Sequence, residues 1–197
     1  MGYGEVNPRG KGVRGKMNKY QTIYADPPWQ QKMMPILKRR PLTASKLPYP
    51  TMTLQDIKAL PVGELAGENC HLWLWTTNAF LHDAFHVIEA WGFKYMMVIT
   101  WVKKSGCGIY WVSTTQPLLF AYKDKCKFPL GKLKPTHLIT PPPRKHSQKP
   151  IEFYDLIESI SPEPRLELFA RNKRDGWDSW GNEVESDIDL SPSGVEE

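Results

Sequence analysis

The residues best suited to chemistry are an acid, two prolines and a tryptophan, Asp26-Pro27-Pro28-Trp29, which follow a short β-branched and aromatic run. Each proline fixes φ near about −65° and lacks an N–H, so the chain is stiff here and the carbonyls of Asp26 and Pro27 are not easily used by a local turn. A carboxylate beside free carbonyls is an acceptor set for an –NH₂ group, and Trp29 offers a flat face to an aromatic ring. The pattern predicts methylation of the exocyclic amino group of a nucleobase. The same residues could form a plain proline turn with Trp29 in the core, and the motif alone leaves both readings open.

The composition indicates one folded domain. The chain has 197 residues, 41% of them hydrophobic, which is enough for a core of ordinary size. We expect a flexible basic head over residues 1–16, a folded domain over residues 17–183 and an acidic, disordered tail over residues 184–197. The formal net charge of +5 is compatible with a polyanionic partner.

Cysteine and histidine spacing does not indicate a metal site. Cys70, Cys107 and Cys126 are odd in number and lack metal-type spacing, so we expect free thiols in a reducing compartment. His82 and His86 are four residues apart but lack the glutamate of the zinc-protease pattern. With no apolar run long enough to span a bilayer and no signal peptide, we expect a cytoplasmic protein without a membrane partner.

Apolar runs alternate with helical periodicity along the chain, which predicts an α/β fold: a mostly parallel sheet covered by helices on both faces. Two long segments, residues 30–50 and 123–149, show no clean periodicity. We expect strands at residues 22–25, 70–76, 95–102, 118–122 and 165–170, and helices at residues 53–60, 79–91 and 150–160.

Ligands of such sheets lie at the carboxyl ends of the strands. Asp26, Lys123 and Arg171 each follow a predicted strand, so we expect them to converge on one crevice. The glycine patterns that hold a dinucleotide or a triphosphate, G-x-G-x-x-G and the P-loop, are missing from the sequence.

Four sets of short stretches occur in an order that resembles one known family, the MT-A70 family of adenine methyltransferases. They are residues 25–29 with 47–52, residues 72–76 with 91–93 and 100–103, residues 108–111 with 118–123, and residues 146–150 with 167–171 and 176–183. The resemblance covers about residues 19–183 and is closest to compact bacterial or phage members. It implies a Rossmann-like class I methyltransferase fold, S-adenosylmethionine as cofactor and methyl transfer to the 6-amino group of adenine.

The resemblance assigns the catalytic role to Asp26, Pro27, Pro28 and Trp29. Asp26 and the Pro27 carbonyl would each accept a hydrogen bond from the target amino group, and Trp29 would frame the base. The nitrogen would then present its lone pair to the methyl donor, so that catalysis is mostly orientation and electrostatics.

The resemblance also implies cofactor contacts. Arg171, Asn182 and Glu183 fall where the family binds the ribose and nearby polar edges, and Lys123 falls near the methionine end. Lys173 stands where eukaryotic members have a histidine, which leaves the methionine-end contacts open.

A base inside a duplex cannot reach such a site, so the enzyme would flip it out or act on a single strand. The segment after the catalytic turn supplies candidate contacts to nucleic acid: Lys38, Arg39, Arg40 and Lys46 for phosphates, and Tyr49 for stacking on a base. A solvated basic loop is an equally good reading of any one of these basic residues.

The expected substrate is DNA, because a compact bacterial or phage protein favours DNA over RNA, and the expected location is the cytoplasm of a bacterium or phage-infected cell. RNA with the same chemistry is the main alternative. A non-catalytic nucleic-acid-binding subunit is another, although the intact Asp-Pro-Pro-Trp motif favours an enzyme. A small-molecule or protein amine is a weaker candidate. A homodimer or a partner subunit is compatible with the sequence.

Overall fold

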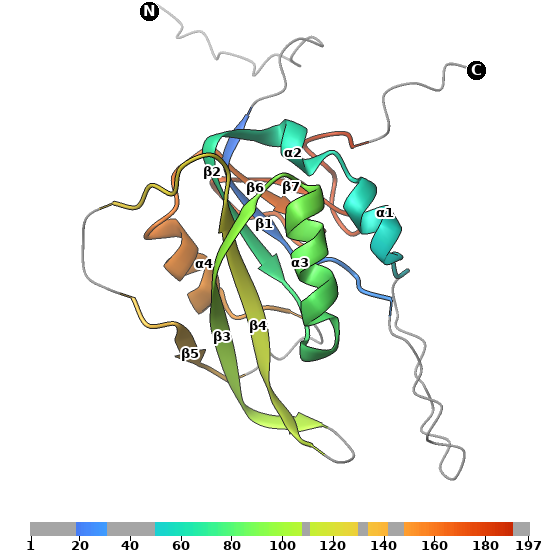
Figure 1. The fold of residues 1–197 in the computed structure, drawn as a ribbon, viewed down its shortest axis with the longest axis vertical. Coiled ribbons are helices and arrows are strands. Elements are labelled where there is room, and N and C mark those ends of the chain that lie inside the picture. Colours follow the sequence, from blue (N-terminus) through green and yellow to red (C-terminus); the bar gives the residue numbers. More distant parts are fainter. Residues whose placement is uncertain (1–18, 31–49, 108–110, 130–133, 142–147, 191–197) are drawn as a thin grey trace, which may run out of the picture.

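The protein is built on one seven-stranded sheet with the order β5-β3-β4-β2-β1-β6-β7 (Figure 1). The computed structural model describes residues 19–30, 50–107, 111–129, 134–141 and 148–190. The strands are β1 (Tyr20–Ala25), β2 (Ala66–Trp75), β3 (Lys94–Cys107), β4 (Ser113–Tyr122), β5 (His137–Ile139), β6 (Arg165–Leu168) and β7 (Trp177–Trp180). The helices are α1 (Leu54–Ala59), α2 (Val62–Leu65), α3 (Leu81–Ala90) and α4 (Ile151–Glu158), with a 3₁₀ turn η2 (Asn78–Phe80).

Among these strands, β4 alone runs against the others. It pairs antiparallel with both β2 and β3, whereas the β1–β2, β1–β6, β3–β5 and β6–β7 pairs are parallel. The sheet is therefore mostly parallel, as the sequence predicts.

Side-chain alternation along the strands builds one core on each face of the sheet. On β2, Leu72 and Leu74 belong to the core that includes α1 and α3, whereas Trp73 and Trp75 belong to the core that includes α4. Figure 1 shows α1 and α3 on one side of the sheet and α4 on the other. Because successive residues of a strand point to opposite faces, a continuous apolar run is the expected pattern for a strand buried on both sides.

Local signals explain where two of the helices begin and end. Thr53 and Asp56 form a capping box at the start of α1, as its sequence predicts. Gly92, with φ of 78°, follows α3 and allows the left-handed turn that ends it. None of the helices in the described residues is long and apolar enough to cross a membrane.

The structure extends the prediction at several places. The strands β3 and β4 form a longer hairpin than expected. The additional residues include Lys103 and Gln116, whose side chains bond each other across the strands. These polar residues give no apolar signal, so the sequence did not indicate the extra length. The short elements β5, β7 and α2 were missed, since three or four residues give too little periodicity to detect.

The expected tail begins too early. Residues 184–190 pack on the domain: Leu190 is buried in the core, and Asp187 bonds the backbone N–H of Ser179 through its carboxylate. Asp187, one of several acids in the expected tail, is thus a structural acceptor. Residues 191–197 and the predicted head, residues 1–16, lie outside the described residues.

Candidate active site

The topology brings two chain segments together at the carboxyl edge of the sheet. The strands β1 and β6 are parallel neighbours, with Ala25 level with Leu168. Asp26 therefore lies beside the segment that leads from Leu168 to Arg171. The chain leaves β1 toward β2 on one side and returns as β6 on the other, so this is the switch point where open α/β sheets bind ligands.

Lys149 is the partner of Asp26 at this edge. Its Nζ contacts Asp26 Oδ2 and lies 5.3 Å from the centre of the Trp75 ring. The Lys149 side chain is 8% exposed and that of Asp26 is 29% exposed, so the pair is partly shielded from water. Lys149 was not predicted as a site residue, although the stretch that resembles the family at residues 146–150 contains it, two residues before α4 begins.

The proline turn uses more of its acceptors than the sequence suggests. Trp29 N–H donates to the Pro27 carbonyl over 2.9 Å, and Met52 N–H donates to the Pro28 carbonyl, also over 2.9 Å. The expectation that a local turn would spare the Pro27 carbonyl is therefore wrong: Trp29, two positions on, closes a three-residue turn onto it. A carbonyl has two lone pairs, so the Pro27 oxygen retains the capacity to accept a second bond.

The sequence left two readings of Trp29 open, a flat face for an aromatic ring and a place in the core, and the structure shows the second. The Trp29 indole is buried, lies parallel to the Phe80 ring at 5.7 Å and donates its N–H to the Trp75 carbonyl at 3.2 Å. A buried indole needs an acceptor for its N–H, and the end of β2 supplies one. Trp29 thus fixes the turn against β2.

A buried polar layer lies under Asp26, on the α4 side of the sheet. Trp75 Nε1 donates to the Tyr24 hydroxyl at 2.6 Å, and the Tyr154 hydroxyl donates to Glu167 Oε1 at 2.9 Å. The Tyr24 and Tyr154 rings are 4.9 Å apart. Burial raises the pKa of Glu167 to about 7, with the charge of Asp26 adding to the rise and the Tyr154 hydrogen bond opposing it. Such a shift is common at functional sites.

The predicted ribose contacts lie past β6 and β7. Arg171 Nε and Glu183 Oε1 are 3.4 Å apart, and Asn182 is exposed on the turn that Glu183 shares. Gly181 allows this turn to lie close to the backbone of Ala170, because a Cβ at position 181 would lie 2.2 Å from the Ala170 carbonyl oxygen. Lys173 instead forms an ion pair with Asp187, which ties it to the packed segment after β7.

Lys123 does not join this crevice, so the predicted convergence is wrong for this residue. Because β4 is antiparallel, its last residue, Tyr122, pairs with His71, which is level with Thr22 near the start of β1, so Lys123 lies toward the opposite edge. The Lys123 ammonium group donates to the carbonyl of Gly63 at 2.9 Å and is 3.5 Å from that of Ala66. Its position supports a role in fixing α2 to the sheet.

The candidate nucleic-acid contacts Lys38, Arg39, Arg40, Lys46 and Tyr49 lie outside the described residues. Among the residues that the structure does describe, no group of three or more His, Cys, Asp or Glu could hold a metal ion. The His82 and His86 rings lie 4.7 Å apart on α3.

Comparison with known proteins identifies related chains. Residues 20–183 match the MT-A70 family. The chain is 33% identical to the type II methyltransferase M.MunI of a Mycoplasma species over 84% of this chain and 78% of that protein. It is 30% identical to the human N(6)-adenine-specific methyltransferase METTL4, over 84% of this chain and 37% of that protein. It is 28% identical to the catalytic subunit METTL3 of the human N(6)-adenosine-methyltransferase, over 91% and 30%. The chain thus spans only about a third of the two human relatives.

The fold and site define a Rossmann-like methyltransferase that uses S-adenosylmethionine. The chain belongs to the MT-A70 family.

The residues at the carboxyl edge fit that cofactor. Ribose hydroxyls are bound by carboxylate, amide and guanidinium groups, which Glu183, Asn182 and Arg171 supply together. The methionine portion carries a carboxylate, and Lys149 places a cation at this edge. When bound, the cofactor supplies an electrophilic methyl group on a sulfonium.

Proposed function

We propose that this protein transfers the methyl group of S-adenosylmethionine to the 6-amino group of adenine in DNA, with Asp26 as the residue that orients the amino group. The observation that carries the proposal is the position of Asp26, which is fixed by the proline turn at the switch point of the sheet and held on one oxygen by Lys149.

Orientation is the main contribution of the chain. The amino nitrogen of adenine is a poor nucleophile because its lone pair is delocalised into the ring. Lys149 engages Asp26 Oδ2, so an amino N–H would bond Oδ1, and the Pro27 carbonyl would accept the second N–H with its remaining lone pair. Two fixed acceptors turn the nitrogen lone pair toward the methyl group, and holding reactants in this way can lower a barrier by several kcal/mol.

The proton leaves last. As the new N–C bond forms, the nitrogen becomes positively charged and its N–H strongly acidic. Asp26 or a water molecule then accepts the proton. The partly shielded setting of Asp26 strengthens its interaction with the charge that develops on the nitrogen.

The polymer we propose is DNA. The bacterial type II methyltransferase M.MunI matches over 78% of its own length, whereas METTL3 matches over 30%. We propose the cytoplasm of a bacterium or of a phage-infected cell as the location, since this is where such DNA lies. RNA and a role as an inactive subunit are outcomes that the following experiment would reveal.

The full-length protein is incubated with radiolabelled S-adenosylmethionine and matched single- and double-stranded pools of DNA and RNA, and the methylated positions are mapped. We expect label on the adenine 6-amino group of DNA. Asp26→Ala and Asp26→Asn should each lower the rate by at least about 100-fold, because one of the two fixed acceptors is lost or weakened.

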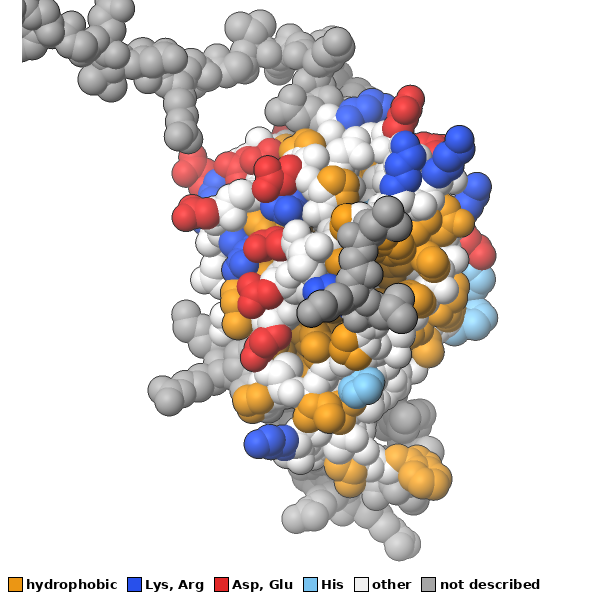
Figure 2. Space-filling view, turned by 90° about the vertical axis from the view of Figure 1, so that its left-hand side faces the viewer, with side chains coloured by type: hydrophobic (Ala, Val, Ile, Leu, Met, Phe, Trp, Pro, Cys, Tyr) orange, Lys and Arg blue, Asp and Glu red, His pale blue; other side chains and the backbone are white. Residues whose placement is uncertain are grey.

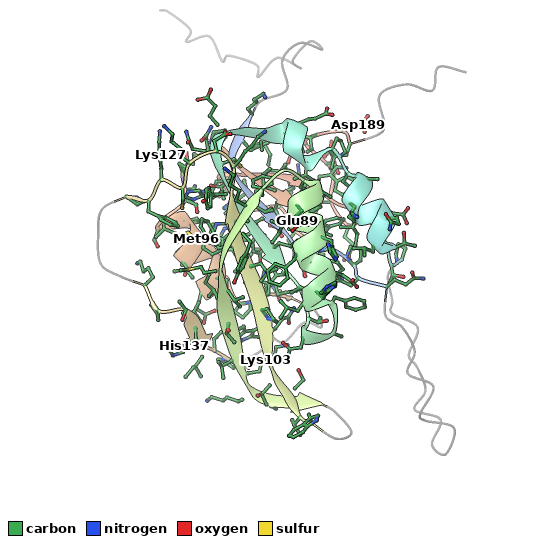
Figure 3. All side chains as sticks on the ribbon, in the orientation of Figure 1. Glu89, Met96, Lys103, Lys127, His137 and Asp189 are labelled. Atoms are coloured by element: carbon green, nitrogen blue, oxygen red, sulfur yellow. The ribbon has the colours of Figure 1, made fainter. Side chains whose placement is uncertain are left out.

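Glu89→Gln is the matched control, since Glu89 is an exposed acid on α3 away from the carboxyl edge (Figure 3). It should keep the wild-type rate. Cofactor affinity, measured by calorimetry, should be similar in wild type and Asp26→Asn. Label on RNA alone would contradict the DNA assignment, and full activity of Asp26→Ala would contradict the role of Asp26.

A further inference from the structure

The β3–β4 hairpin continues well past the rest of the sheet. We call this extension the arm, meaning residues 100–107 of β3, residues 113–117 of β4 and the adjoining Trp111 and Val112. Ala25 is level with Leu74, and the residue after Leu74, Trp75, is level with Leu118 and Ile99. Asp26 is therefore level with Ile99, where the arm begins.

The arm extends outward on the side of the active site. Five positions separate Leu118 from Ser113, which at about 3.3 Å per residue is on the order of 15–20 Å beyond the level of Asp26. The strand β4 lies two strand positions from β1, which is about 10 Å sideways. Figure 1 shows the arm protruding from the body at this end of the sheet.

The base of the arm is firmly held. The strand β5 pairs with β3 from Thr100 to Val102, and buried Trp101 donates its indole N–H to the Thr140 carbonyl at 3.0 Å. On the other strand, Asn78 of η2 contacts the carbonyl and hydroxyl oxygens of Thr115 at 3.4 and 3.2 Å. The arm is thus a supported projection of the sheet.

A large aromatic side chain at the far end of the arm is almost fully in solvent. Trp111 is 87% exposed, and the next residue, Val112, is 66% exposed. Most tryptophans of this chain are buried with an acceptor for the indole N–H, as at Trp29, Trp75 and Trp101. Folding gains little from an indole in water, and an exposed tryptophan offers a flat face on which a base can stack.

The charge of the hairpin has one sign. Residues 94–122 contain three lysines, Lys94, Lys103 and Lys104, and no Asp or Glu. Lys103 lies 4.4 Å over the Trp101 ring and bonds Gln116, whereas Lys104 is exposed on the arm. Figure 3 places Lys103 on the arm side of β3 and Met96 toward the other end of the strand. On the face shown in Figure 2, the described acidic side chains lie away from the lower end of the molecule, where the arm is.

We infer that the arm binds the nucleic acid that flanks the target adenine, with Trp111 stacking on a base and Lys104 contacting a phosphate. This inference rests on the proposed function and extends it to a second contact region on the same substrate. A flat π face combined with positive charge suits a polynucleotide, because every base can stack and each nucleotide carries a negative charge. At 3.4 Å per base pair, the length of the arm corresponds to about five base pairs beyond the target.

The experiment measures binding of the full-length protein to fluorescein-labelled DNA by anisotropy, with single-stranded and duplex forms tested side by side. One oligonucleotide has ten nucleotides on each side of a central adenine, and the other has two on each side. We expect Trp111→Ala to raise Kd for the long oligonucleotide about 10-fold, as the loss of one stacked base would. The short oligonucleotide does not reach the arm, so wild type and variant should bind it equally.

Two further variants separate stacking from charge. Trp111→Tyr keeps an aromatic face and should restore most of the affinity for the long oligonucleotide. Lys104→Ala should reduce the slope of log K against log salt by about 0.9, the value for one phosphate contact with a duplex. Met96→Ala and Lys94→Ala are the matched controls, because they remove an exposed apolar and an exposed basic side chain from the opposite end of the same strand. Both should leave the Kd for the long oligonucleotide unchanged.

Binding needs no turnover, so this test is independent of whether the protein methylates DNA. Loss of methylation in Asp26→Asn, together with the expected rise in Kd for the long oligonucleotide in Trp111→Ala, would support both the proposed function and the role of the arm. Methylation by the wild type combined with an unchanged Kd in Trp111→Ala would overturn the role of the arm and leave the proposed function intact. Light scattering measures the mass of the assembly. A different mass for Trp111→Ala and wild type, with the same Kd for the long oligonucleotide, would show that the arm contacts another subunit and would also overturn the inference.

Discussion

Lys149 and Asp26 lie 123 positions apart in the chain, and they form an ion pair at the carboxyl edge of the sheet. Asp26 follows β1, and Lys149 precedes α4, which packs on the tryptophan-rich face of the sheet. The lysine is more buried than the acid, so its charge is directed to this one carboxylate and to the Trp75 ring beneath it. The pair defines the orientation of the acid on which the proposed chemistry depends.

Lys149→Met should lower kcat for methyl transfer by about 100-fold, because a misplaced Asp26 no longer holds the amino group in line with the methyl donor. It should also lower the free energy of unfolding by about 1–2 kcal/mol, since the partly buried Asp26 carboxylate loses its partner. Single-turnover kinetics and urea denaturation measure the two effects. Lys149→Arg keeps the charge and should retain more activity than Lys149→Met. Equal kcat in wild type and Lys149→Met would show that the pair does not orient Asp26.

Glu167 should make stability depend on pH. Burial raises the pKa of this carboxyl group from 4.5 to about 7, so between these two values the folded protein holds a proton that the unfolded chain has lost. The contribution of Glu167 to stability is therefore complete below pH 4.5 and decreases as the pH rises through 7. Glu167→Gln, which stays neutral, should gain up to about 3 kcal/mol relative to wild type between pH 5 and 8.

Urea denaturation of both proteins across this pH range measures the difference. The Glu158→Gln variant is a useful comparison, because Arg174 and Trp177 hydrogen bonds outweigh burial and lower the pKa of Glu158. Its stability relative to wild type should not rise with pH. A constant difference between Glu167→Gln and wild type would show that Glu167 is ionised throughout the range.

Gly181→Ala should disturb the turn that carries Asn182 and Glu183. The added Cβ would lie 2.2 Å from the Ala170 carbonyl oxygen, so the turn must move away from β6. We expect a loss of about 2 kcal/mol in the free energy of unfolding and about a 10-fold rise in the Kd for S-adenosylmethionine.

Gly92→Ala separates the two effects. Gly92 has φ of 78° with open space around its Cβ position, and it lies at the end of α3. This change should cost about 1 kcal/mol of stability and leave cofactor affinity unchanged. Calorimetric titration and thermal unfolding would detect both outcomes. Unchanged cofactor affinity in Gly181→Ala would place the ribose contacts elsewhere.

Much of the fold could be predicted from local sequence. The run His71-Leu72-Trp73-Leu74-Trp75 identified a strand buried on both faces, and the capping box at Thr53 identified the start of α1. These signals can be read from the sequence because an apolar run and a capping box each involve only a few neighbouring residues. The elements that escaped prediction are short, as in β5 and β7, or polar, as in the arm.

The sequence by itself determined the family, the cofactor and the acid at the end of β1, because these depend on residue types in a fixed order. The tertiary structure decided which residues meet that acid. The antiparallel direction of β4 carries Lys123 to the opposite edge, and the packing of α4 brings Lys149 to Asp26 instead. The direction of one strand is set by pairing along its whole length, which leaves no signal in the few residues around a lysine.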